Sequence, residues 1–294
     1  MKRKMDEEHA LTGVAKSNYS NRSGSRKGFL RADLHIHTLL SPCGSLEMSP
    51  ARIVSEAKKR GLDMIGITDH NTTKQCREVV RIGEAEGLKV ICGAEVTTQE
   101  EAHCLAYFEN FEMLDAFQEY LDLHLPDIKN SPEKFGDQVW VDSNEMIAGE
   151  ETRLLISALN VSVEKIEKRV HELNGIFIAA HIDRPSYSLI SQLGFIPKTL
   201  NLDGVELTDI SKRESMINTY SLPDDLVFIT SSDAHYPHQI GTRFVNLKMR
   251  EATFDEFRMA LATLNLPMRG EERIKEIFNK GNELSSFGGD GGGL

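Results

Sequence analysis

The sequence has few cysteines and no spacing that would join them. The four cysteines, Cys43, Cys76, Cys92 and Cys104, form no Cys-x-x-Cys pair and lie in or near segments that we expect to be regular. This favours reduced thiols over a disulfide framework. A zinc ribbon is not supported either, because such a site needs closely paired thiolates.

Long hydrophobic runs are also absent. No stretch approaches the roughly 20 apolar residues that a membrane-spanning helix needs. Residues 1–10 carry charge but lack the apolar segment of a secretory signal. We therefore expect a cytoplasmic protein with no membrane partner.

Positive charge is in deficit, with 34 Lys and Arg against 45 Asp and Glu and a net charge of −11. Dedicated nucleic-acid binders usually carry a basic face that neutralises phosphates. The balance therefore argues against a nucleic-acid polymer as partner and favours a small substrate. Bound cations can supply locally the positive charge that the chain lacks overall. The sequence carries no indication of oligomeric state.

The two ends differ in composition from the middle of the chain. Residues 1–28 are polar, which predicts a flexible N-terminal arm. Residues 285–294 are mostly glycine, which predicts a disordered tail. Residues 29–284 are then expected to form one domain, because α/β barrels of roughly 250 residues fold as a unit.

Within that domain, short apolar runs alternate with amphipathic segments, the pattern of βα units and a parallel sheet. Helices are expected at 51–60, 73–86, 112–124 and 163–173, with Pro50 before the first and glycines just past several ends. The predicted strands lie at 30–36, 64–68, 90–96, 104–108, 176–180, 204–207 and 226–231.

The gap between the fourth and fifth predicted strands is too long for a single helix. Residues 109–174 are expected to hold an insertion of helices, with a hairpin around Val139, Trp140 and Val141. Two interpretations stay open. The insertion either covers a substrate site as a lid or packs on the outside of the domain.

Six of the ten histidines stand at the ends of short apolar runs, each beside a carboxylate or another histidine. Loops at the carboxyl ends of barrel strands build the active site, so these side chains can converge. Period-two geometry sends His35 and His37 to one face of a strand, where both can reach one metal. Asp33, on the same face, is expected to orient a ligand. The candidate ligands are His35, His37, His70, Glu95, His103, His181, Asp233 and His235.

Eight candidates exceed what a single four-coordinate zinc uses, so the sequence predicts two or three divalent metal ions. Glu95 is the candidate bridge, since one carboxylate can hold two cations together. Taken singly, Glu95 is equally typical of a surface ion pair and His103 of a structural histidine.

These motifs, in this order, resemble the PHP family, named for polymerase and histidinol phosphatase, over about residues 30–247. The resemblance implies an α/β fold, a distorted (β/α)7 barrel with an insertion between strands 4 and 5. It also implies a trinuclear site of zinc, manganese or iron and phosphoester hydrolysis. Carried over by position, it implies three metal sites: His35, His37, Glu95 and Asp233; His70 and His235; and Glu95, His103 and His181.

The chain departs from the family in its first motif. Many members have Ser-Asp-Gly where this chain has Ser-Pro-Cys-Gly from Ser41 to Gly44. The additional ligand of the second metal is therefore open between Glu47, the first candidate, and Cys43. Each also has a structural alternative, Glu47 as a charge at a helix start and Cys43 as a small buried residue.

The expected reaction is in-line attack of a metal-bridged hydroxide on a small phosphomonoester, a phosphorylated metabolite or nucleotide. Arg184 and Arg243 are candidate phosphate ligands, and His238 is the candidate acid for the leaving group. Each has a plain alternative as a solvated surface residue. Two other functions stay open: a nuclease acting on oligonucleotides, and a non-catalytic metal-binding module.

Overall fold

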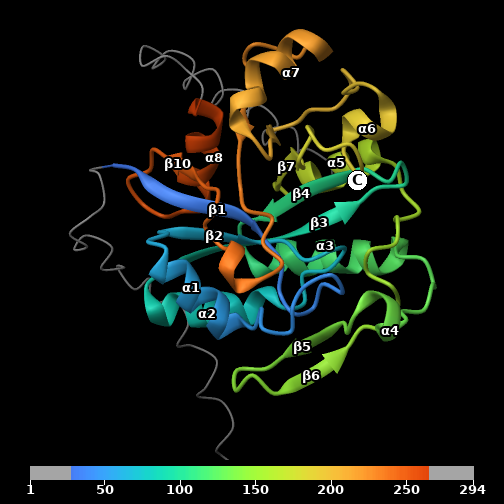
Figure 1. The fold of residues 1–294 in the computed structure, drawn as a ribbon, viewed down its shortest axis with the longest axis vertical. Coiled ribbons are helices and arrows are strands. Elements are labelled where there is room, and N and C mark those ends of the chain that lie inside the picture. The colour runs from blue at the N-terminus through green and yellow to red at the C-terminus, as the bar shows by residue number, and fades with distance from the viewer. Residues whose placement is uncertain (1–27, 265–294) are drawn as a thin grey trace, which may run out of the picture.

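Eight strands form one sheet that curls into a nearly closed barrel (Figure 1). The computed structural model describes residues 28–264, so the predicted tail and all of the predicted arm except Gly28 lie outside the described residues. The strand order is β10 (Val245–Leu247), β1 (Leu30–Ile36), β2 (Met64–Ile67), β3 (Lys89–Thr97), β4 (His103–Phe108), β7 (Ile176–Ala179), β8 (Gly204–Glu206) and β9 (Phe228–Ile229).

The gap between the two edges of the sheet is bridged next to the histidines of β1. The backbone N–H of Ala234, which follows β9, donates to the carbonyl of His35 at 3.2 Å. The N–H of His37 donates back to the carbonyl of Ala234 at 2.9 Å. The chain after β9 is therefore fixed against the end of β1, and the two histidine motifs are brought together.

The predicted fold class, an α/β barrel with an insertion, is confirmed, but two strands differ from the predicted parallel sheet. Strand β4 runs antiparallel to both β3 and β7. The connection of residues 98–102 is too short for a crossover, which needs a dozen or more residues, whereas a hairpin needs only a short turn. Strand β10, which pairs antiparallel with β1, was not predicted.

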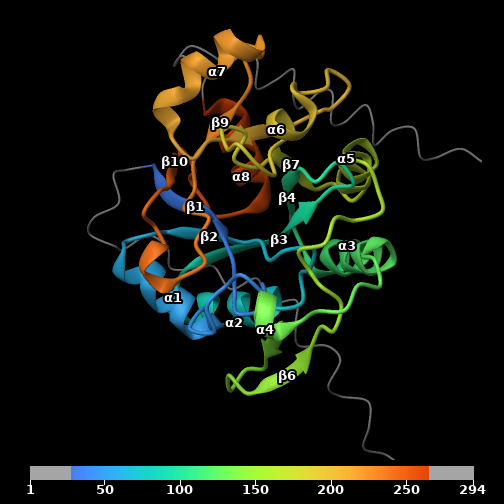
Figure 2. The same cartoon turned by 45° about the vertical axis from the view of Figure 1, so that its right-hand side comes forward.

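Helices cover the outside of the sheet, with α1 and α2 side by side beneath β1 and β2 (Figures 1 and 2). Pro50 stands in the first turn of α1 and Gly87 ends α2 in the left-handed conformation, as their positions predict. No helix of the described residues is long and apolar enough to cross a membrane. The helices are α1 (Pro50–Lys59), α2 (Cys76–Glu86), α3 (Phe111–His124), α4 (Pro132–Phe135), α5 (Val163–Glu172), α6 (Leu189–Leu193), α7 (Arg213–Tyr220) and α8 (Phe254–Thr263), with 3-10 turns η1 (Ile210–Lys212) and η2 (Pro237–Gln239).

Alternation along the strands separates two apolar cores. In β7, Ile176 and Ile178 belong to one core, and Phe177 and Ala179 belong to the other. The smaller core also takes Phe257 and other buried residues of α8. Both faces of the sheet are therefore buried, which leaves the strand ends as the place for polar side chains.

The insertion between β4 and β7 carries a second sheet, the hairpin of β5 (Val139–Val141) and β6 (Ile147–Glu150). The side chain of Gln75, at the start of α2, accepts from the backbone N–H of Val141 at 2.8 Å and donates to its carbonyl at 3.2 Å. Glu145 accepts from the N–H of Ala51 in α1 at 3.0 Å. The hairpin therefore packs beside α1 and α2, at the bottom of both views (Figures 1 and 2). This agrees with the outside-packing interpretation for this part of the insertion.

His171, which is not one of the predicted metal ligands, makes the stability of the fold depend on pH. His171 in α5 lies between Glu167 at 2.6 Å and Asp203 at 3.0 Å. Burial lowers the pKa of His171, but the two carboxylates outweigh it and leave the pKa above its ordinary value. Because the folded pKa is raised, the stabilisation is full below the unfolded pKa of about 6.5 and is lost as pH rises through the folded value.

We therefore expect His171→Gln to lower the free energy of unfolding more at pH 5.5 than at pH 9.5, by about 1 kcal/mol. Urea denaturation at the two pH values measures the difference. His124→Gln is the control, because His124 is partnered by the ring of Tyr120 rather than by carboxylates. An equal loss at both pH values for His171→Gln would contradict the assignment.

Candidate metal centre

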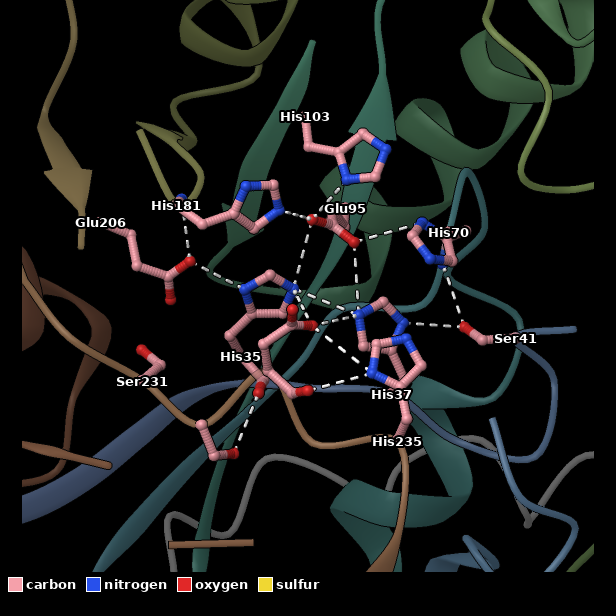
Figure 3. A network of polar contacts seen from close by, with 12 residues as sticks. His35, His37, Ser41, His70, Glu95, His103, His181, Glu206, Ser231 and His235 are labelled. Atoms are coloured by element: carbon pink, nitrogen blue, oxygen red, sulfur yellow. Dashed lines mark hydrogen bonds and ion pairs between the residues drawn. The ribbon is translucent and has the colours of Figure 1, made fainter. Parts of the chain in front are cut away.

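Histidines that follow or end β1, β2 and β7, and one that follows β9, turn toward Glu95 near the end of β3 (Figure 3). The reversed direction of β4 explains how His103 takes part. His103 begins β4, and the start of an antiparallel strand lies beside the end of β3. All eight predicted ligands are thus brought to one place: His35, His37, His70, Glu95, His103, His181, Asp233 and His235.

The first of three overlapping groups contains His35, His37, Glu95 and Asp233, with one ligand atom of each within 4.8 Å of the others. The Nε2 atoms of His35 and His37 are 3.2 Å apart. Asp233 Oδ1 lies 3.2 Å from both of these nitrogens. This is the set that the PHP resemblance implies for one metal.

The second group is His37, His70 and His235, and the third is His70, Glu95 and His103. The PHP resemblance implies His70 with His235 and Glu95 with His103, so both pairs recur. His181 lies outside these groups, but its Nε2 is 3.0 Å from Glu95 Oε1.

Glu95 stands at the centre, as a bridging carboxylate should. It is 1% exposed, and each of its oxygens faces more than one imidazole. The distances are 2.9 Å, 3.0 Å and 3.4 Å from Oε1 to His103, His181 and His35, and 3.2 Å and 3.3 Å from Oε2 to His70 and His37.

Hydrogen bonds on the far side of the rings fix which nitrogens face the centre. The Ser41 hydroxyl donates its hydrogen to Asp69 Oδ1 at 2.7 Å. Ser41 Oγ therefore accepts from the Nδ1–H of His37 at 3.0 Å. The His235 Nδ1–H donates to the carbonyl of Asp233 at 3.0 Å. In the neutral rings the Nε2 lone pairs of His37 and His235 are then free for a metal.

The ring nitrogens and carboxylate oxygens of the centre lie close together in a way that a bound cation would stabilise. Two Nε2 atoms face each other at 3.2 Å beside carboxylate oxygens. Burial lowers the pKa of His37, but hydrogen bonds and charges of Asp233 and Glu95 raise it to about 9. Among residues 28–264, the Nδ1 atoms of His70 and His181 are buried without hydrogen-bond partners. Buried ring nitrogens without hydrogen-bond partners, at a site that attracts positive charge, are consistent with bound divalent metal ions.

Two of the predicted ligands hold an uncommon backbone conformation. His181 has φ of +30° and Asp233 has φ of +52°, which few non-glycine residues adopt. The loop of Asp233 is held by Asp33, which accepts from the N–H groups of Ser232 at 2.9 Å and Gly241 at 2.7 Å. Asp33 therefore holds the loop that carries the predicted ligand Asp233, and its role in orienting a metal ligand stays a prediction. Strain of this kind persists where the surroundings enforce it, as at functional sites.

Neither candidate for the additional ligand joins the groups found among residues 28–264. Glu47 is exposed and lies beside Ser49 and Arg52, lining a surface cavity with Glu145. Cys43 is exposed. Both stay predictions.

The three predicted substrate residues lie in different surroundings. Arg184 reaches the cluster, with Nη2 at 2.5 Å from Asp233 Oδ2 and its side chain 38% exposed. Arg243 donates from Nε and Nη2 to the carbonyls of Ser231 and Ser232, which fixes the loop after β9. His238 is exposed in η2, where its carbonyl accepts from Arg60. A role in substrate binding or proton transfer stays a prediction for Arg243 and His238.

Two residues at the cluster were missed. Glu206 is 2% exposed, and its Oε2 accepts from Nδ1 of His35 at 3.0 Å. Tyr187 is 51% exposed and stacks on the ring of His103, with centroids 5.0 Å apart. Glu206 is the last residue of β8 and the next to last of the predicted strand 204–207, so the strand-end pattern that identified Glu95 also indicates it. Tyr187 lies in an irregular loop and gives no such signal.

The strand ends of this barrel gather histidines around a shared carboxylate, a donor set suited to divalent metal ions. The chain matches the family model described as PHP domain over residues 33–183, which is about half of its length. It therefore belongs to the PHP family.

Among curated proteins, the chain is similar to the uncharacterized protein YqxK of Bacillus subtilis strain 168, with 26% identity over 286 residues. The match covers 85% of this chain and 64% of YqxK. The chain thus spans less than two thirds of that relative.

Among solved structures, the chain is similar to endonuclease Q of Pyrococcus furiosus, which is described as lesion-specific. The match has a TM-score of 0.62 and 22% identity, and it covers 80% of this chain and 56% of the endonuclease. A complex of endonuclease Q with a 27-mer duplex that carries an abasic lesion matches with a TM-score of 0.63 at 23% identity, over 79% of this chain and 56% of that one. A protein of Bifidobacterium adolescentis assigned as a metal-dependent phosphoesterase matches with a TM-score of 0.53 at 21% identity, over 82% of this chain and 98% of its own. At these identities the likeness shows a shared fold.

The endonuclease Q complex contradicts one prediction. The net charge of −11 argued against a nucleic-acid polymer as partner, yet a protein of this fold takes a DNA duplex at its active site. The physical reason is that net charge is a sum over the whole chain, whereas binding depends on the local field. The prediction from net charge against a nucleic-acid polymer as partner was therefore wrong.

Proposed function

We propose that this protein hydrolyses phosphoester bonds at a centre of two or three divalent metal ions, zinc, manganese or iron. The observation that carries the proposal is the placement of Glu95, whose two oxygens lie within 3.4 Å of five histidines. A carboxylate that faces several imidazole nitrogens is an arrangement that can hold neighbouring cations at one site. The ligands proposed are those of the three groups, together with His181.

Divalent ions at such a centre supply an activated water and stabilise negative charge on phosphoryl oxygens. The chain contributes the positioning. Ser41 and Asp69 hold the ring of His37, while Asp33 holds the loop of Asp233. Arg184 sits at the edge of the cluster, where its partly exposed guanidinium can bind a phosphate oxygen with its planar array of donors.

Two substrate classes fit this chemistry. The PHP resemblance favours a small phosphomonoester, for which His238 is proposed as the acid that protonates the leaving group. The second candidate is a phosphodiester of DNA, favoured by the fold shared with endonuclease Q along 79% of this chain. In either case Arg184 is proposed to bind the phosphoryl group.

A substrate panel tests the proposal and separates the two classes. Wild type and His35→Ala are assayed with phosphomonoesters, nucleotides, bisphosphates, short oligonucleotides and an abasic duplex, with and without manganese. We expect hydrolysis that requires metal and is lost in His35→Ala. Release from small esters supports the phosphomonoester class, and cleavage of the DNA substrates alone supports the nuclease. Absence of hydrolysis from metal-loaded protein contradicts the proposal and favours a binding module.

A further inference from the structure

Glu206 makes two contacts that both act on predicted metal ligands (Figure 3). Its Oε2 accepts from the His35 ring at Nδ1, at 3.0 Å, and from the backbone N–H of His181, at 3.2 Å. The side chain comes from the end of β8, while β1 supplies His35 and the segment just after β7 supplies His181. One buried carboxylate oxygen therefore joins three segments of the barrel.

The contact with His35 fixes the state of its ring. An ionised carboxylate can only accept, so the Nδ1 of His35 must carry the hydrogen. The Nε2 of the neutral ring then directs its lone pair to the opposite side, where Asp233 Oδ1, another possible metal ligand, lies 3.2 Å from it. With the other tautomer, Nδ1 would face Glu206 without a hydrogen and Nε2 would be blocked.

The contact with His181 fixes a backbone. With φ of +30°, His181 lies outside the conformations that most residues prefer. The hydrogen bond to Glu206 holds its N–H in that position, which sends Nε2 to Glu95 at 3.0 Å. Glu206 itself belongs to none of the groups of possible metal ligands among the described residues.

We propose that Glu206 is a positioning residue, which raises the metal affinity of the centre by presetting His35 and His181 without binding metal itself. This inference rests on the metal-dependent function proposed above. A carboxylate that accepts from the far nitrogen of a ligating histidine orients the ring and raises its basicity.

The test is the Kd for Mn²⁺ of chelator-treated protein, measured by competition with a chromogenic chelator. Loss of such a partner typically weakens metal binding by about 10- to 100-fold, which we expect for Glu206→Ala. Glu206→Gln keeps an oxygen that can accept both hydrogen bonds, and its amide NH₂ can take the place of Oε1, which has no hydrogen-bond partner within residues 28–264. We expect it to recover most of the affinity.

Asp203→Ala is a matched control. The Asp203 Oδ2 also accepts from a histidine ring, His171 at 3.0 Å, and from a backbone N–H, Phe177 at 2.7 Å, but at the other end of β7. We expect it to lower stability and leave the Kd for Mn²⁺ unchanged. If Glu206→Ala fails to fold, Glu206→Gln is compared with Glu206→Asp, whose shorter carboxylate cannot reach both donors and is expected to bind Mn²⁺ more weakly.

The outcomes are distinct. Wild-type protein that binds no divalent metal overturns the proposed function, and this inference falls with it. Wild-type protein that binds Mn²⁺ while folded Glu206→Ala binds it equally well overturns only the role of Glu206. Equal Mn²⁺ affinities of Glu206→Gln and Glu206→Asp would also overturn the role of Glu206.

Discussion

Glu95→Gln abolishes metal-dependent hydrolysis, with an expected loss of at least about 1,000-fold, the upper range for removing one group that stabilises transition-state charge. The substitution keeps the size of the side chain. It removes a negative charge that two imidazoles face within 3.0 Å, and it places an NH₂ donor where a cation would bind. Assay of hydrolysis together with the metal content of the purified variant measures both effects.

Glu151→Gln is the matched control for this prediction. Glu151 is also a buried glutamate, but it pairs with Lys74 at 2.7 Å and Arg153 at 3.2 Å beside the β5–β6 hairpin. We expect the control to lose stability and to keep its metal and its activity. A Glu95→Gln variant with wild-type activity would show that this carboxylate does not organise the centre.

Metal removal lowers the melting temperature by roughly 10 °C. A ligand at 1,000 times its Kd stabilises the folded state by about 4 kcal/mol, and one kcal/mol shifts Tm by about 2–4 °C in domains of this size. The cluster gives the reason. His35 and His37 lie side by side among carboxylates, and the pKa of His37 is raised to about 9, so the folded chain gains from bound positive charge.

Thermal unfolding of chelator-treated protein, alone and with added Mn²⁺, measures this shift. Glu95→Gln serves as the comparison, because it is expected to show a much smaller rise in Tm with Mn²⁺. Equal melting temperatures of the wild type with and without metal would contradict binding at the buried cluster.

The sequence predicted the cluster because strand ends follow from local pattern. Apolar runs that close on His35, His70 and His181 place these residues by rules of period and burial, without knowledge of the folded chain. The same rule, applied to the end of β8, would have added Glu206. The location of the candidate ligands could therefore be predicted more easily than the chemical role of each residue.

The remaining features depend on contacts across the fold. Arg243 looked free to bind phosphate, but it donates to carbonyls of Ser231 and Ser232, which only the folded loop brings close. The reversed β4 depended on a short turn, and the missed β10 has only three residues, of which Asn246 is exposed. Such short segments carry too little pattern to distinguish a strand from a loop.

The number of metal ions held by each folded chain tests the central claim most directly. After loading with Mn²⁺ and removal of excess metal, native mass spectrometry of the wild type counts the bound ions. The three overlapping groups, two of which contain Glu95, predict two or three ions per chain, with fewer in Glu95→Gln. A wild-type chain that retains no ion, or only one, would contradict a polynuclear centre.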